Sequence, residues 1–189
     1  MKVAPVRFML VTALAIVFGI ELITGRVGND AALLKLGALP DDGQLHREYW
    51  RVATYSFVHF NWLHLVVNAL VLLWIGRVVE KQVGAATGAL IYFASVLCSA
   101  ALILLVHNWY PKPGATVGAS GGNFGLLGAA LIISYRQKAG RRLRFWLWVA
   151  LFAGFAVSLL PNISMAGHIG GILGGVLLAF LVKPQRNES

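Results

Sequence analysis

The sequence has few charged residues and a single cysteine. Only 12% of its 189 residues are Asp, Glu, Lys or Arg, and none lies within 52–76, 82–111, 113–135 or 145–182. Such runs exclude an ordinary soluble domain, because roughly 20 apolar residues span a bilayer as a helix, which satisfies its own backbone in lipid. Cys98 has no partner in the chain, which excludes an intrachain disulfide and leaves a small packing residue.

Acidic residues are scarce relative to basic ones. Seven Asp and Glu face sixteen Lys and Arg, which gives a formal net charge of +9. A basic surface can bind nucleic acid. In a chain with long uncharged runs, however, an excess of basic residues is more typical of cytoplasmic loops and of contact with anionic lipid. We therefore expect membrane lipid, and no nucleic acid, among the partners.

The uncharged runs predict an all-α membrane protein, a single domain over 1–189 with six spans. The last run is too long for one helix, and Pro161-Asn162 divides it. The expected spans are about 5–24, 58–77, 85–107, 116–135, 145–160 and 164–182.

The start of the chain and the connection after the first span need separate interpretation. Lys2 and Arg7 before an apolar run also fit a signal peptide, but no small-residue cleavage site follows. Residues 25–57 then form a long, mixed connection in which 31–36 and 47–57 predict short interfacial helices. A connection of this length is expected to be folded.

The distribution of basic residues predicts the orientation. With six spans both termini lie on one side, which then carries eleven Lys and Arg against five on the other. The positive-inside rule places both termini in the cytoplasm and the long, partly helical first loop outside. The six-span core without a long targeting extension further predicts a bacterial inner membrane.

Polar residues recur at one depth in three spans that run in the same direction. His64 and Asn68 lie in the second span, Ser120 opens the fourth, and His168 lies one to two turns into the sixth. Polar groups inside a bilayer are costly and usually line a site or a water-filled cavity. The pattern predicts one site within the membrane, open to the outer side.

Glycine spacing indicates how the fourth and sixth spans meet. Gly171 and Gly175 follow His168, and Gly121 follows Ser120, in small-residue ridges that allow close helix approach. Close packing would bring the Ser120 oxygen and a His168 nitrogen within hydrogen-bond reach, which is the arrangement of a nucleophile and its general base. Glu21 is the only acid within a span, and it has no evident link to His168, so we expect a dyad.

His64 and Asn68 are expected to form an oxyanion hole. They share a helix face at i, i+4, and the Ser120 N–H near a helix N-terminus supplies a third donor. Three histidines could also indicate a metal, but His64 and Asn68 make a poor pair of ligands and His59 falls off their face, so no metal is expected. His59 is interpreted as structural or water-contacting, and His107 as interfacial.

At these residues the chain resembles the rhomboid family of intramembrane serine proteases. The resemblance covers residues from about 50 to 180 and is ordered along the chain. It is carried by Trp50-Arg51, His59, His64, Asn68, Gly76, Val79-Glu80-Lys81, Gly118-Ala119-Ser120-Gly121, His168-Ile169-Gly170-Gly171 and Gly175.

The resemblance implies a fold, roles and substrates. Ser120 would be the nucleophile and His168 the general base, with His64, Asn68 and the Ser120 N–H as the oxyanion hole. Family substrates are single-span membrane proteins cut in or near the span, with lateral access past the fifth helix and no cofactor. Gly118, Gly121, Gly171 and Gly175 would support the packing.

The chain departs from the family pattern at two places. A tyrosine that stacks on the histidine is frequent four residues after the serine, but here the residue is Phe124, whose ring could still support the packing against His168 without the hydroxyl. Gly122-Asn123 replaces the more usual small or apolar pair. These differences bear on rate and fine geometry more than on activity.

Two alternatives stay open. A non-catalytic binder or transporter of membrane segments could use the same polar cavity, although the presence of both Ser120 and His168 favours the peptidase. A dedicated processing peptidase for C-terminal anchors of exported proteins is equally compatible with the residues. The oligomeric state is not predicted.

Overall fold

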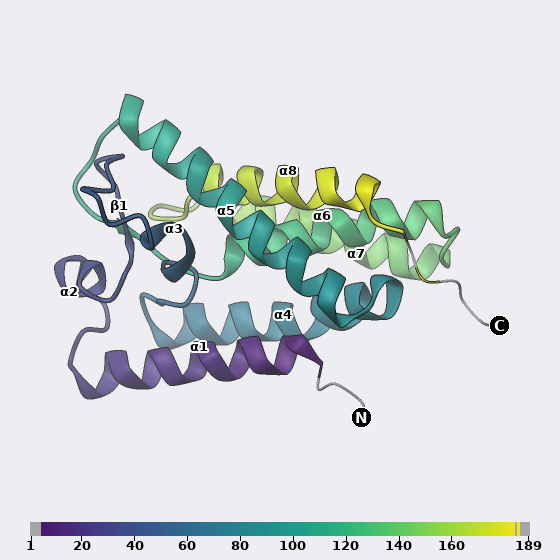
Figure 1. The fold of residues 1–189 in the computed structure, drawn as a ribbon, viewed down its shortest axis with the longest axis horizontal. Helices are drawn as coiled ribbons and strands as arrows, with labels where there is room; N and C mark the ends of the chain where they lie inside the picture. The colour runs from purple at the N-terminus through teal and green to yellow at the C-terminus, as the bar shows by residue number, and fades with distance from the viewer. Residues whose placement is uncertain (1–4, 184, 186–189) are drawn as a thin grey trace.

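Helices make up most of the chain in the computed structural model, which describes residues 5–183 and 185 (Figure 1). In order, the elements are α1 (Val6–Ile23), α2 (Asp30–Leu34), β1 (Leu39–Pro40), α3 (Arg51–Thr54), α4 (Trp62–Val83), α5 (Ala85–Trp109), β2 (Ala115–Thr116), α6 (Ser120–Arg136), α7 (Arg141–Val157) and α8 (Met165–Leu181). The predicted all-α class is confirmed.

Six of these helices occupy the stretches expected to span a membrane. By length and composition α1, α4 and α5 can cross a bilayer, and α8 is a shorter apolar helix. The six-span count and the single-domain limits of 1–189 therefore stay predictions. Lys2 and Arg186, two of the residues used to predict the orientation, lie outside the described residues.

Local interactions set the start of two helices later than predicted, a side-chain cap for α4 and a strand pairing for α6. α4 begins at Trp62 because the Asn61 side chain caps it, accepting the His64 N–H at 2.8 Å. His59 therefore lies in the loop before the helix. α6 begins at Ser120, because Ala115–Thr116 pair with Leu39–Pro40 in a short antiparallel ladder.

The connection between α1 and α4 is folded, with less helix than predicted. The 47–57 stretch is helical only over α3, because His46 and Arg47 have positive φ and turn the chain. The Arg51 guanidinium then donates to the carbonyls of Leu34 and Ala38 at 2.5 and 2.8 Å, tying α2 and α3 together. The β1–β2 ladder attaches this connection to the segment that leads into α6.

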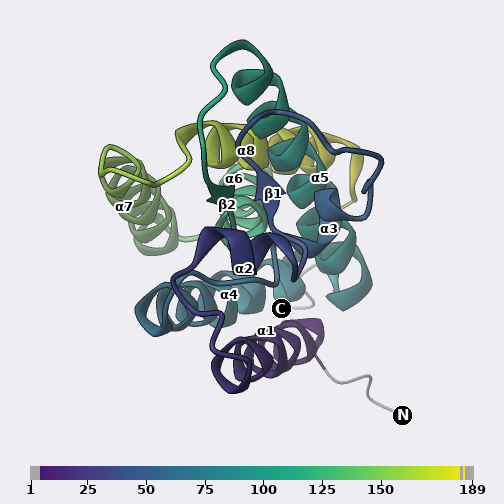
Figure 2. The ribbon, with the colours of Figure 1, turned by 90° about the vertical axis from the view of Figure 1, so that its left-hand side faces the viewer.

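The central helix is α6. It packs against α4, α5, α7 and α8, whereas α1 packs on α4 and α5, and α7 has its main contacts with α6. Figure 2 shows α7 to the left of α6 and α8, with α4 and then α1 at the bottom of the bundle. The start of α6 is thus enclosed by helices, and its residues from Gly121 to Leu131 are buried.

Glycines let α6 and α8 touch through their backbones. A Cβ placed on Gly171 would overlap the carbonyl of Gly121, and one on Gly175 would overlap the carbonyl of Gly125. On the other side of α6, Ser99 of α5 occupies the space beside Gly121. The starts of α6 and α8 are fixed side by side as a result.

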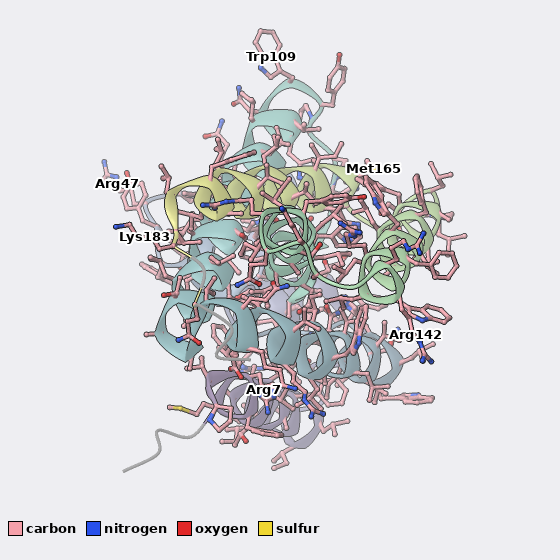
Figure 3. The ribbon with its side chains drawn as sticks, turned by 90° about the vertical axis from the view of Figure 1, so that its right-hand side faces the viewer. Arg7, Arg47, Trp109, Arg142, Met165 and Lys183 are labelled. Carbon is pink, nitrogen blue, oxygen red and sulfur yellow. The ribbon has the colours of Figure 1, made fainter. Side chains whose placement is uncertain are left out.

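α1 is tied to the rest of the chain at both ends. At its start Arg7 donates to the Glu80 carboxylate at the end of α4, both from its guanidinium and from its backbone N–H. Near its other end the buried Glu21 accepts the His59 N–H at 3.0 Å. Figure 3 looks onto the end where α1 begins and shows Arg7 there, with Arg142 pointing outward from α7.

Candidate active site

Ser120 is the first residue of α6, directly after a turn that depends on glycine. Gly118 has φ +114°, a conformation that side-chain-bearing residues rarely adopt, and its N–H donates to the Tyr55 carbonyl at 2.9 Å. The first N–H groups of a helix have no intrahelical acceptor. The Ser120 hydroxyl therefore stands beside unpaired backbone donors.

The Ser120 hydroxyl meets the imidazole of His168. The His168 Nε2 lies 3.0 Å from the Ser120 Oγ, and the His168 side chain is buried. The contact follows from the backbone packing of α6 on α8, which sets Gly121 against Gly171. The proximity expected from the glycine spacing is present.

Phe124 covers one face of the His168 ring. The two rings stack with centroids 4.0 Å apart and planes 15° from parallel. Phe124 also meets Phe155 edge-on, and a Cβ on Gly154 would overlap its ring. Phe124 thus fills the space between α7 and His168, and the stack forms without a tyrosine hydroxyl.

A residue that the sequence did not single out contacts the second nitrogen of His168. The Ser158 Oγ, one residue after α7, lies 2.5 Å from His168 Nδ1 and donates to the Gly154 carbonyl at 2.8 Å. Ser158 is buried. The only signal in the sequence was a polar residue close to the Pro161 break, and nothing in the spacing linked it to His168.

His64 and Asn68 lie on α4 beside the turn that carries Ser120. The His64 ring is against Gly118, where a Cβ would come within 2.7 Å of its Nε2. The Asn68 Nδ2 donates to the His64 carbonyl at 2.9 Å. The structure therefore brings all four predicted site residues to one place.

Asn123 of α6 is a second residue that sequence analysis did not assign. Its Nδ2 donates to the Asn68 Oδ1 at 3.0 Å and lies 3.1 Å from the Asn68 backbone carbonyl. Both side chains are buried. The departure from the family pattern at position 123 thus has a partner on α4, because the amide orients the Asn68 side chain.

Two further histidines lie outside the Ser120–His168 pair. His59 is buried, packs edge-on against the His64 ring with centroids 5.1 Å apart, and has its Nδ1 3.1 Å from the Phe57 carbonyl. His107, predicted to be interfacial, lies in the last turn of α5, and its buried ring is 3.3 Å from the Asp41 carboxylate; its depth in the membrane stays a prediction. The contact brings the first connection beside the end of α5.

Comparison with known proteins decides the family. The model of the rhomboid domain matches residues 46–185. The chain belongs to the rhomboid family. The matched part of this rhomboid contains the contact between Ser120 and His168, and α1 precedes it.

Curated relatives extend across bacteria, plants and protists. The chain is 31% identical to rhomboid protease GluP of Bacillus subtilis over 91% of its own length and 34% of the relative's. It is 34% identical to RHOMBOID-like protein 1 of Arabidopsis thaliana, over 83% and 41% of the two lengths. It is 30% identical to Rhomboid-like protease 3 of Toxoplasma gondii, over 79% and 58%.

The alignments cover only part of each relative's length. The chain spans between about a third and three fifths of their lengths. Family membership together with the apolar helices α1, α4 and α5 identifies an integral membrane protein.

Proposed function

We propose that this rhomboid is an intramembrane serine endopeptidase that cleaves single-span membrane proteins in or near their spans. The observation that carries the proposal is the 3.0 Å contact between Ser120 Oγ and His168 Nε2, across two helices whose backbones touch. A protein that only binds membrane segments has no need of a hydroxyl directed at an imidazole. Names of the relatives, which include rhomboid proteases, agree with this activity.

The two side chains divide the chemistry as a nucleophile and a general base. His168 Nε2 takes the Ser120 proton as Oγ attacks the scissile carbonyl, and returns that proton to the leaving amine. The acyl-enzyme formed on Ser120 is then hydrolysed by water, which His168 deprotonates in turn. No cofactor takes part in these steps.

The oxyanion of the tetrahedral intermediate needs donors that are oriented in advance. The Ser120 N–H at the start of α6, the Asn68 amide and the His64 ring are the proposed donors. One Asn68 N–H is bonded to the His64 carbonyl, which leaves the second N–H available to an oxyanion, while Asn123 restrains the amide oxygen. Donors oriented in this way cost little reorganisation when charge develops.

The proposed setting follows the predicted orientation. Both termini are cytoplasmic, the membrane is a bacterial inner membrane, and the site opens to the outer side near the starts of α4, α6 and α8. A substrate helix would approach within the bilayer, beside α7. Gly118, Gly121, Gly171 and Gly175 act through packing.

The test is covalent labelling by a fluorophosphonate probe together with cleavage of a model single-span substrate. Purified protein should be labelled at Ser120, not at all in Ser120→Ala, and much less in His168→Ala, because the unassisted hydroxyl is a weak nucleophile. Ser134→Ala, a buried α6 serine bonded only to its own helix, is the control and should label normally. Equal labelling of wild type and Ser120→Ala would refute the proposal.

A further inference from the structure

Ser158 forms the last side-chain link of a hydrogen-bond chain that ends on Ser120. The chain runs from the Ser120 Oγ to His168 Nε2, from His168 Nδ1 to the Ser158 Oγ, and on to the Gly154 carbonyl, with separations of 3.0, 2.5 and 2.8 Å. His168 and Ser158 are both buried. Each proton in this chain can therefore be assigned by counting donors and acceptors.

Two arrangements of the protons are possible with a neutral imidazole. In the first, Ser120 donates to Nε2, Nδ1–H donates to the Ser158 Oγ, and the Ser158 hydroxyl donates to the Gly154 carbonyl, which makes three hydrogen bonds. In the second, Ser158 donates to Nδ1 and Nε2–H donates to the Ser120 Oγ, which makes two. The Ser120 hydroxyl proton then has no acceptor among the hydrogen bonds of the described residues.

The first arrangement is favoured because it makes one more hydrogen bond within the protein and pairs both the Nδ1–H and the hydroxyl of the buried Ser158. It places a lone pair on Nε2, directed at the Ser120 hydroxyl, which is the form of histidine that can act as a base. The second arrangement has a proton on Nε2 and cannot accept one from Ser120. The hydroxyl of Ser158 therefore selects between a competent and an incompetent tautomer.

We propose that Ser158 is the positioning residue of His168, the neutral counterpart of the carboxylate that orients histidine in a Ser-His-Asp triad. This inference rests on the proposed function. The Ser158 oxygen accepts the hydrogen bond from His168 Nδ1–H, while the Ser158 hydroxyl donates to the carbonyl of Gly154, four residues earlier. The buried contact carries no formal charge, so it avoids the cost of placing a carboxylate in an apolar site.

The same contact makes the base depend on α7. Ser158 directly follows α7, whose main contacts are with α6, and the Phe124 ring is wedged between Gly154 and His168. A shift of the end of α7 would move the Ser158 Oγ away from Nδ1 before it disturbed the packing of α6 on α8. The orientation of the base is thus set by a different helix from the one that carries it.

The test compares Ser158→Ala and Ser158→Thr in cleavage of a model transmembrane substrate. Ser158→Ala should lower kcat about 10- to 100-fold, as expected when a buried hydrogen-bonding group loses its partner. KM should change less than about twofold, because Ser158 does not touch substrate. Ser158→Thr keeps the hydroxyl and should retain most of the wild-type kcat.

Ser134→Ala is the matched control. Ser134 is a fully buried helix serine whose hydroxyl donates to its own helix, at the Leu131 carbonyl, and it is remote from His168. Its loss should leave kcat unchanged even if thermal stability falls. A kcat for Ser158→Ala equal to the wild-type value would overturn the role of Ser158.

A second measurement needs no variant to fold. The nitrogen-15 chemical shifts of the His168 ring in detergent micelles should show a protonated Nδ1 and an unprotonated Nε2 in the wild type. A dominant Nε2–H form would overturn the inference. Activity remaining in Ser120→Ala would instead refute the proposed function, so the two failures are distinguishable.

Discussion

The imidazole of His168 is restrained by two residues of α6 and by one residue directly after α7. Ser120 of α6 meets Nε2, Ser158 after α7 meets Nδ1, and the Phe124 ring covers one face. A general base works only when its lone pair is directed at the proton it abstracts. Each of these three neighbours therefore bears on the rate, although only Ser120 exchanges a proton with the base.

Phe124→Tyr tests how tightly this site is packed. The tyrosine ring keeps the stack on His168, but its hydroxyl is directed at Gly154, which already lies against the end of the Phe124 ring. We expect a folded protein with a lower thermal midpoint, since overpacking costs about 1–3 kcal/mol of stability, and with kcat lowered by less than about 10-fold, because the stack on His168 is kept. The measurements are kcat and the thermal midpoint in detergent; an unfolded protein would contradict the stacked arrangement.

At the scale of elements, the contact of α6 with α8 is made by backbone against backbone. The glycines at 121, 125, 171 and 175 leave no room for a methyl group on either helix. Helix association in a bilayer depends on such close packing, because lipid provides no hydrophobic drive to pair helices. Separation of α6 and α8 by even a small distance would also lengthen the contact between Ser120 and His168.

Gly171→Ala should abolish activity and lower stability together. Its methyl group would overlap the Gly121 carbonyl, and neither backbone can yield without moving a helix. Gly19→Ala in α1 is the control: no atom lies within 4 Å of its added Cβ, so it should stabilise the protein by roughly 0.5–1 kcal/mol. Thermal unfolding in micelles measures both; an active, equally stable Gly171→Ala would contradict the close packing.

The helices were foreseeable from the sequence to different degrees. α1 and α5 match the expected spans closely, because uncharged runs bounded by charge report directly on where a helix can lie in lipid. The start of α4 did not follow, because the Asn61 side chain fixes it and hydrophobicity does not. α3 is shorter than expected because two residues with positive φ precede it.

The positions of four site residues could be predicted, because each is a polar residue at a recognisable depth in an apolar span. Ser120, His168, His64 and Asn68 are unusual in apolar spans, so their common depth grouped them, and the glycine spacing paired Ser120 with His168. Ser158 and Asn123 were not predictable, since their roles depend on how α7 meets α8 and how α4 faces α6. Such contacts are properties of the packed molecule and have no local pattern in the chain.

For the whole molecule, the orientation in the membrane can be tested with two residues, one at the end of α5 and one at the start of α7, which lie at opposite ends of the bundle (Figure 1). Trp109 and Arg142 are exposed, and each is replaced by cysteine in a Cys98→Ser background. In right-side-out spheroplasts an impermeant maleimide should label Trp109→Cys at once and Arg142→Cys only after permeabilisation, because charged reagents do not cross the hydrocarbon. Immediate labelling of Arg142→Cys would reverse the proposed orientation.

Because α8 is synthesised after α6, the two halves of the proposed site appear at different times during translation. Ser120 emerges during synthesis 48 residues before His168, and the carbonyls of Gly121 and Gly125 lack the contact of Gly171 and Gly175 until α8 exists. The ion pair of Arg7 with Glu80, by contrast, can close early. On the proposed mechanism a nascent chain holds only an inert hydroxyl, and α8 completes the fold and supplies the base in one step. A partly synthesised chain that lacks α8 would therefore be unable to cleave a substrate.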